Sequence, residues 1–179
     1  MKKVISLGLL LAWIMAPGAL AAHGAETLSP GVSFKVTLSP AGSFEARSGE
    51  LTGTVQPQAG GFEAASVVLS VATLKTGISL RDRHMSEKYL ESAKYPKATV
   101  TQALGKDGKF KAKLELHGRT RDVMGTYEVR TSAEGTKYLE ARFKTALSAF
   151  EIEEASYMGV GVEDEVEVTA VVPVGKSAK

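Results

Sequence analysis

The chain has 179 residues, with 22 Lys and Arg against 20 Asp and Glu, and it contains no cysteine. This length fits one domain and leaves little room for two. The near-balance of charge argues against a nucleic-acid partner, which would need a basic stripe. The lack of cysteine excludes disulfides and the lipid-attachment cysteine of a bacterial lipoprotein.

The first 21 residues have the three parts of a secretory signal. Residues 2–3 are lysines, residues 4–16 are a mostly apolar run, and residues 19–21 form a small-x-small cleavage pattern. The apolar run is too short to span a bilayer comfortably. We therefore expect cleavage after residue 21, leaving 22–179 as one domain in the periplasm of a bacterium. Two lysines leave with the signal, so the mature chain is formally neutral.

The mature chain is dominated by segments with the period of a half-buried strand. Apolar and polar residues alternate clearly at 32–38, 109–116, 139–147 and 165–172. Less regular strands fit 51–55, 64–74, 98–104 and 123–129. Because the connections are short, we expect about eight strands, most of them antiparallel neighbours.

One helix is expected to interrupt the strands at residues 79–94. Ser79 and Asp82 have the spacing of a capping box, and Pro96 stops any continuation. Apolar side chains recur near helical spacing at Leu80, Met85 and Tyr89.

Eight alternating strands fit three architectures: a soluble barrel, a small outer-membrane barrel and a β-sandwich. An outer-membrane barrel needs aromatic girdles, but the only tryptophan, Trp13, lies in the signal. The last residues are also charged rather than aromatic, at Lys176 and Lys179. Alternation alone leaves the soluble barrel and the sandwich open.

A resemblance favours the barrel. Residues 73–85, followed by Tyr89-Leu90 and by 94–100, resemble the signature of the YceI-like family of exported lipid-binding proteins. The core of that signature is Arg81-Asp82-Arg83-His84-Met85, leading to Tyr95-Pro96. Residues 114–120, 150–152 and 164–166 resemble further motifs of the family, although Tyr89-Leu90 stands where two phenylalanines are usual.

The resemblance implies an all-β, lipocalin-like antiparallel eight-stranded β-barrel with a short inserted helix. It also implies that the lumen holds a polyisoprenoid, an isoprenoid quinone or a similar amphiphile, which the protein carries or sequesters. Small inward residues favour a hollow lumen, and a core filled with phenylalanine stays an alternative. The predicted lumen contacts are Phe34, Val36, Leu80, Met85, Tyr89, Phe110, Ala112, Leu114, Ala141, Phe143 and Val168.

A polar constellation beside these apolar residues predicts a head-group site. Arginine can pair with a phosphate or carbonyl, and histidine can donate a hydrogen bond. The predicted head-group contacts are Arg81, Asp82, His84 and Tyr95. Structural roles remain open for each of them, with Asp82 capping its helix and the others packing or pairing locally.

Catalytic and metal-binding signals are weak. There is no nucleophile elbow, and His23, His84 and His117 are scattered rather than set at metal-ligand spacing. His117 falls on the polar parity of its strand, so we expect it to face solvent. We expect no cofactor, no metal, no nucleic-acid partner and no stable membrane insertion. Two alternatives to lipid binding stay open: an enzyme acting on an isoprenoid or quinone, and a structural or stress-related barrel that binds nothing.

Overall fold

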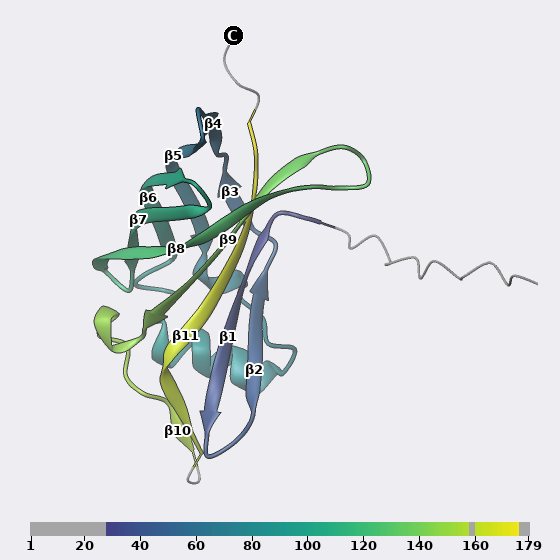
Figure 1. Cartoon of the computed structure of the whole chain (residues 1–179). Coiled ribbons are helices and arrows are strands. Elements are labelled where there is room, and N and C mark those ends of the chain that lie inside the picture. Colours follow the sequence, from purple (N-terminus) through teal and green to yellow (C-terminus); the bar gives the residue numbers. More distant parts are fainter. Residues whose placement is uncertain (1–27, 158–159, 176–179) are drawn as a thin grey trace, which may run out of the picture.

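The computed structural model describes residues 28–157 and 160–175 (Figure 1). The predicted signal at 1–21 lies outside these residues. The described strands are β1 Gly31–Ser39, β2 Ser43–Ser48, β3 Leu51–Gly53, β4 Gln56–Gln58, β5 Gly61–Ser70, β6 Lys97–Lys106, β7 Lys109–Leu116, β8 Arg119–Thr131, β9 Lys137–Ala146, β10 Ser156–Tyr157 and β11 Val160–Pro173. The helical elements are α1 Ser79–His84, a π-helical turn Met85–Tyr89, and 3₁₀ turns at Val71–Thr73 and Ser148–Phe150.

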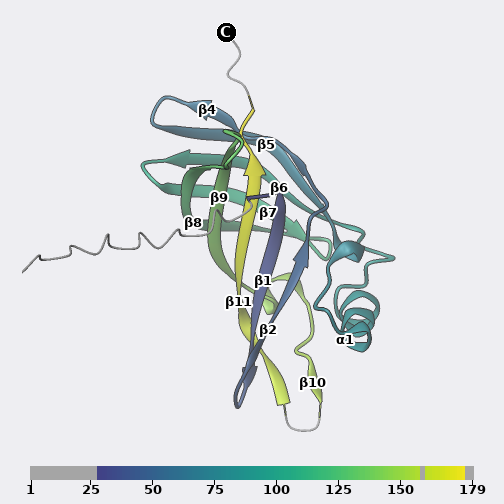
Figure 2. The same ribbon diagram turned by 90° about the vertical axis from the view of Figure 1, so that its right-hand side faces the viewer.

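The strands form one antiparallel sheet that curls into a nearly closed barrel (Figures 1 and 2). Its order is β2-β1-β11-β9-β8-β7-β6-β5-β3, with β10 added to β11 and β4 added to β5. The strands from β5 to β9 follow one another as a meander, whereas β1 pairs with β11 from the other end of the chain. The predicted all-β antiparallel barrel with an inserted helix is confirmed.

Backbone pairs engage each end of the strand path, at the edge strand β2 and just beyond the edge strand β3. Arg47 and Lys75 each donate their N–H to the carbonyl of the other, at 2.8 and 2.9 Å. Beyond β3, Val55 donates to the carbonyl of Pro173 at 3.1 Å and accepts from Gly175 at 2.8 Å. Both edges of the strand path are therefore joined to other parts of the chain.

Side chains of one parity point into the barrel and form the core. On β7 the inner residues are all buried, and the outer lysines and glutamate between them are all exposed. The inner residues of this strand are Phe110, Ala112, Leu114 and Leu116. This pattern confirms the alternation read from the sequence at 109–116.

Aromatic residues and glycines alternate along one row that crosses the inner face. The register places Gly105 between Phe62 and Phe110, and Gly125 between Phe110 and Phe143. The ring centroids of Phe62 and Phe110 are 6.5 Å apart, and those of Phe110 and Phe143 are 6.0 Å apart. A Cβ at Gly125 would come within 2.8 Å of the Phe110 ring. The rings lie over the glycines and fill this part of the interior.

The structure corrects several predicted boundaries. Strands β2, β4 and β10 had no predicted counterpart, and the strand predicted at 64–74 ends at Ser70. After Ser70 the chain turns because the Thr73 hydroxyl donates to the Ser70 carbonyl at 2.7 Å. The helix predicted at 79–94 ends at Tyr89.

Gly125→Ala tests the row of rings and glycines. The added methyl would meet the Phe110 ring and the carbonyl of Arg142, so we expect a loss of about 1–3 kcal/mol in the free energy of unfolding, the usual range for overpacking. The matched control is Gly161→Ala on β11, where a Cβ would meet nothing within 4 Å. Chemical denaturation measures both. Equal stability of the two variants would contradict this description of the row.

Candidate functional site

The connection from β5 to β6, residues 71–96, crosses one end of the barrel, and we call it the lid (Figure 2). Its first part is bound to β2 through the backbone pair at Lys75. Its last part contacts the turn between β7 and β8, where Tyr95 packs edge-on against His117 with ring centroids 4.4 Å apart. Its helical part therefore lies between two fixed ends.

The start of the lid helix is held by Asp82 rather than by a Ser79 cap. Ser79 is not the N-cap residue, and Ile78, which is, makes no side-chain cap bond. Asp82 instead accepts from the backbone N–H and the hydroxyl of Thr76, at 2.7 and 2.6 Å. These hydrogen bonds, with smaller help from the charges of Lys75 and Arg81, hold the pKa of the Asp82 carboxyl below its usual range.

Arg81 points from the lid toward β2. Its Nε donates to the Thr76 hydroxyl at 3.0 Å, and its guanidinium carbon lies 4.3 Å from the centre of the Phe44 ring. Among the described residues its two terminal nitrogens make no hydrogen bond. The terminal N–H donors of Arg81 therefore lie where the polar lid meets the apolar core.

The lid helix has two distinct faces. Met85, Tyr89 and Leu90 pack against the core, as predicted for the first two. Leu80 is 55% exposed, so its predicted place in the lumen is wrong, and His84 is exposed on the same side. The physical reason is angular: Leu80 and Met85 are five residues apart, which sets them about 140° apart on a helix.

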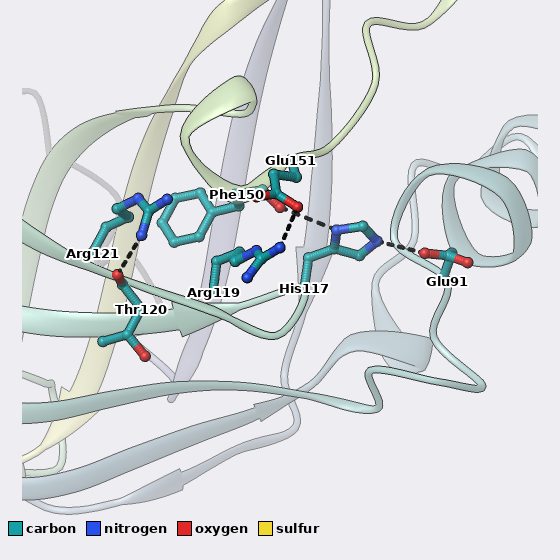
Figure 3. A network of polar contacts seen from close by, with 7 residues as sticks. All are labelled: Glu91, His117, Arg119, Thr120, Arg121, Phe150 and Glu151. Atoms are coloured by element: carbon teal, nitrogen blue, oxygen red, sulfur yellow. Dashed lines mark hydrogen bonds and ion pairs between the residues drawn. The ribbon is translucent and has the colours of Figure 1, made fainter.

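A partly buried histidine, His117, holds the far end of the lid (Figure 3). The Nε2 atom of His117 lies 2.8 Å from the Glu91 carboxylate, and its Nδ1 lies 3.1 Å from the carbonyl oxygen of Phe150. Only 11% of the His117 side chain is exposed, so its predicted solvent-facing place is wrong. His117 and Gly118 both have positive φ in a two-residue turn, and alternation does not set side-chain direction in such a turn. The His117-Gly118 dipeptide between two strand patterns was the sequence signal that could have identified this turn.

An ion pair and a capped turn lie beside this contact. Arg119 donates to Glu151 at 2.5 Å and holds the pKa of that carboxyl below its usual range (Figure 3). Asp164 accepts from the backbone N–H and hydroxyl of Ser148 at 2.7 and 2.6 Å, which lowers its pKa. These bonds order the 3₁₀ turn that carries Phe150.

The predicted lumen residues mostly lie on the inner face, and some keep accessible surface. Phe34 and Phe143 are inner residues of β1 and β9, yet they are only partly buried, and the same holds for Ala170 on β11, which was not among the predicted contacts. Each side chain shares the parity of buried core residues on its own strand or on the paired strand. Of the other predicted lumen residues, the buried ones are Val36, Phe110, Ala112, Leu114, Ala141 and Val168.

Two concavities on the described residues lie elsewhere. One, of about 200 Å³, lies beside Glu128, Glu140 and Arg142, and the other, of about 280 Å³, lies between the start of β1 and the end of β2. Both are below the roughly 300–1,000 Å³ of usual ligand sites. Glu140 has the polar parity of the alternating segment 139–147, yet it is only 5% exposed, and Arg130 and Arg142 pair with it.

No group of three His, Cys, Asp or Glu side chains among residues 28–157 and 160–175 is placed to hold a metal ion. Within the same ranges, no helix is long and apolar enough to cross a membrane.

Asp82→Asn tests the anchoring of the lid through its pH dependence. A carboxyl with a lowered pKa in the folded state adds stability above its unfolded pKa of about 3.9, and this contribution disappears as the pH falls through the folded value. We therefore expect Asp82→Asn to lower the Tm at pH 7 and the difference from wild type to shrink below about pH 4.

The matched control is Asp107→Asn in the exposed turn between β6 and β7, which should change the Tm little. Thermal unfolding followed by circular dichroism from pH 7 to acid measures all three proteins. A difference for Asp82→Asn that stays constant over this range would contradict the anchoring role of its charge.

Comparison with known proteins places this architecture in a family. The model of the YceI-like domain matches residues 26–174. No curated protein sequence matches the chain. The structure of BcnA from Burkholderia cenocepacia is similar, with a TM-score of 0.67 and 18% identity over 81% of this chain and 96% of that one.

Two further solved structures share the fold. A polyisoprenoid binding domain from Saccharophagus degradans has a TM-score of 0.63 and 19% identity, over 82% of this chain and 93% of that one. A YceI protein from Campylobacter jejuni has a TM-score of 0.52 and 15% identity, over 72% of this chain and 82% of that one. The family model covers most of the residues that form the barrel and its lid, and the chain belongs to the YceI-like family.

Proposed function

We propose that this protein binds a long apolar lipid, a polyisoprenoid, an isoprenoid quinone or a similar amphiphile, inside its barrel and carries or sequesters it. The observation that carries the proposal is the accessible apolar surface of Phe34, Phe143 and Ala170 on the inner side of the sheet. The polyisoprenoid binding domain from Saccharophagus degradans, which shares the fold, supports this ligand class.

The lipid tail would supply most of the affinity. Each CH₂ group moved from water to the apolar interior contributes about 0.8 kcal/mol. A chain of many such groups would reach useful affinity before it is fully enclosed. The tail therefore needs an apolar path rather than specific contacts.

The head group would supply selection, and Arg81 is placed for it. Its terminal N–H donors are unused among the described residues, and its guanidinium lies against Phe44 where the lid meets the barrel. Of the other predicted head-group residues, Asp82 is engaged by Thr76, Tyr95 packs against His117, and His84 lies on the outer face of the lid. We assign the head-group contact to Arg81 alone.

We also propose that the protein works outside the cytoplasm. Residues 1–21 have the composition of a secretory signal, and cleavage after Ala21 would leave the whole described barrel intact.

A barrel that binds nothing is the competing function, and one observation favours it. The rings of Phe62, Phe110 and Tyr127 fill part of the interior, with those of Phe62 and Tyr127 4.7 Å apart. A core filled throughout would leave no room for a tail.

Ala170→Phe distinguishes the two functions. If the interior beside Ala170 receives a lipid tail, the new ring takes that space, so natively purified protein should lose most of its bound lipid while the delipidated form keeps its Tm. In a filled core the same change should cost about 1–3 kcal/mol of stability. Mass spectrometry measures the lipid in an organic extract, and the intact mass shows whether the chain starts at Ala22.

Thr169→Phe is the matched control, because Thr169 lies on the outer parity of the same strand. It should keep the lipid content of the wild type. Extracts of wild-type protein that contain no lipid, together with a lower Tm for Ala170→Phe, would contradict lipid binding.

A further inference from the structure

The outer face of the lid carries two large apolar side chains that nothing in the described chain covers. Ile78 directly precedes α1 and Leu80 lies in its first turn, and each is more than half exposed. The opposite face of the same helix already supplies Met85 and Tyr89 to the core. Packing among residues 28–157 and 160–175 therefore does not account for Ile78 and Leu80.

Basic side chains lie around this apolar pair, with Arg83 and Lys88 carrying the positive charge. Arg83 and His84 follow Leu80 by three and four residues, so they share its side of the helix, and Lys88 lies one turn further on. All three are exposed, and within residues 28–157 and 160–175 none of them forms an ion pair. Glu87 is the carboxylate on this face, so the face has a net positive charge.

Exposed apolar side chains flanked by cations are typical of helices that lie at the surface of an anionic bilayer. The apolar side chains enter the boundary between head groups and acyl chains, and the cations meet the negative head groups. We infer that the outer face of the lid docks on an anionic phospholipid membrane, with Ile78 and Leu80 inserted and Arg83 and Lys88 against the head groups.

The position of the lid makes this surface useful to a lipid-binding barrel. The lid crosses one end of the barrel, and its inner residues touch the core. Docking through the outer face would hold that end of the barrel at the bilayer. The inference goes beyond the proposed function, since membrane docking could be present whatever the barrel binds.

Binding to vesicles tests the apolar part of this surface. The probe is a sedimentation assay with vesicles of equimolar phosphatidylglycerol and phosphatidylcholine, with every variant in the same natively purified form. Ile78→Ser combined with Leu80→Ser should weaken partitioning by about tenfold or more. The matched control is Leu104→Ser combined with Met124→Ser, two exposed apolar residues on the outer face of β6 and β8, which should partition as the wild type does.

A second pair of variants tests the charges. Arg83→Gln combined with Lys88→Gln should weaken partitioning by about 30-fold, the product of two head-group contacts. High salt should remove most of this difference because it screens the charges. Lys106→Gln combined with Lys109→Gln, on the turn between β6 and β7, is the control and should change partitioning little.

Unchanged partitioning of both lid variants, or an equal loss in the controls, would overturn the docking surface. Unchanged Tm values would show that each variant is folded. Uptake of a detergent-dispersed polyisoprenoid alcohol is measured in parallel. Intact uptake with lost vesicle binding supports docking, whereas vesicle binding without any uptake counts against the proposed function and leaves the docking surface standing.

Discussion

Backbone pairing at the two edges of the sheet, β2 and β3, is the constraint on which the rest of the structure depends. An open sheet edge presents unpaired N–H and C=O groups that can pair with other chains. The Arg47–Lys75 pair occupies part of the β2 edge, and the bonds of Val55 to Pro173 and Gly175 join the β3 side to β11. Because Lys75 belongs to the lid, the contact that covers part of the β2 edge also fixes where the lid begins.

The other end of the lid and the turns beside it contain unfavourable backbone conformations, which contacts with other parts of the fold must stabilise. Glu91, His117 and Glu151 all have positive φ, which costs non-glycine residues of order 1–3 kcal/mol each. His117 contacts Glu91 and the carbonyl oxygen of Phe150, and Arg119 pairs with Glu151, so each of the three positions is held by a polar contact (Figure 3). Polar contacts thus collect at the rim while the inner face stays apolar, the separation that an amphiphile with one polar end requires.

The sequence predicted those parts of the fold in which the local pattern of apolar and polar residues matches their burial in the folded protein. Strand β7 has lysine or glutamate at every outer position, so its inner face was unambiguous. Strand β2 was missed because it is six residues long and carries the polar Ser48 at a buried position. Leu80 was misplaced because the contacts at the ends of a one- or two-turn helix decide which of its faces turns toward the core. His117 was misplaced because its contacts come from residues 26 and 33 positions away, which no local pattern reports.

The central claim is that a lipid occupies the inner side of the sheet, and methyl-labelled NMR of the natively lipid-loaded protein tests it most directly. The measurement is the set of nuclear Overhauser effects between lipid protons and protein methyl groups. The account predicts contacts to the methyls of Ala170 and Val168, which point inward, and none to the exposed methyls of Met124 and Leu104 on the outer face. Contacts confined to exposed methyls, with none to Ala170 or Val168, would contradict it.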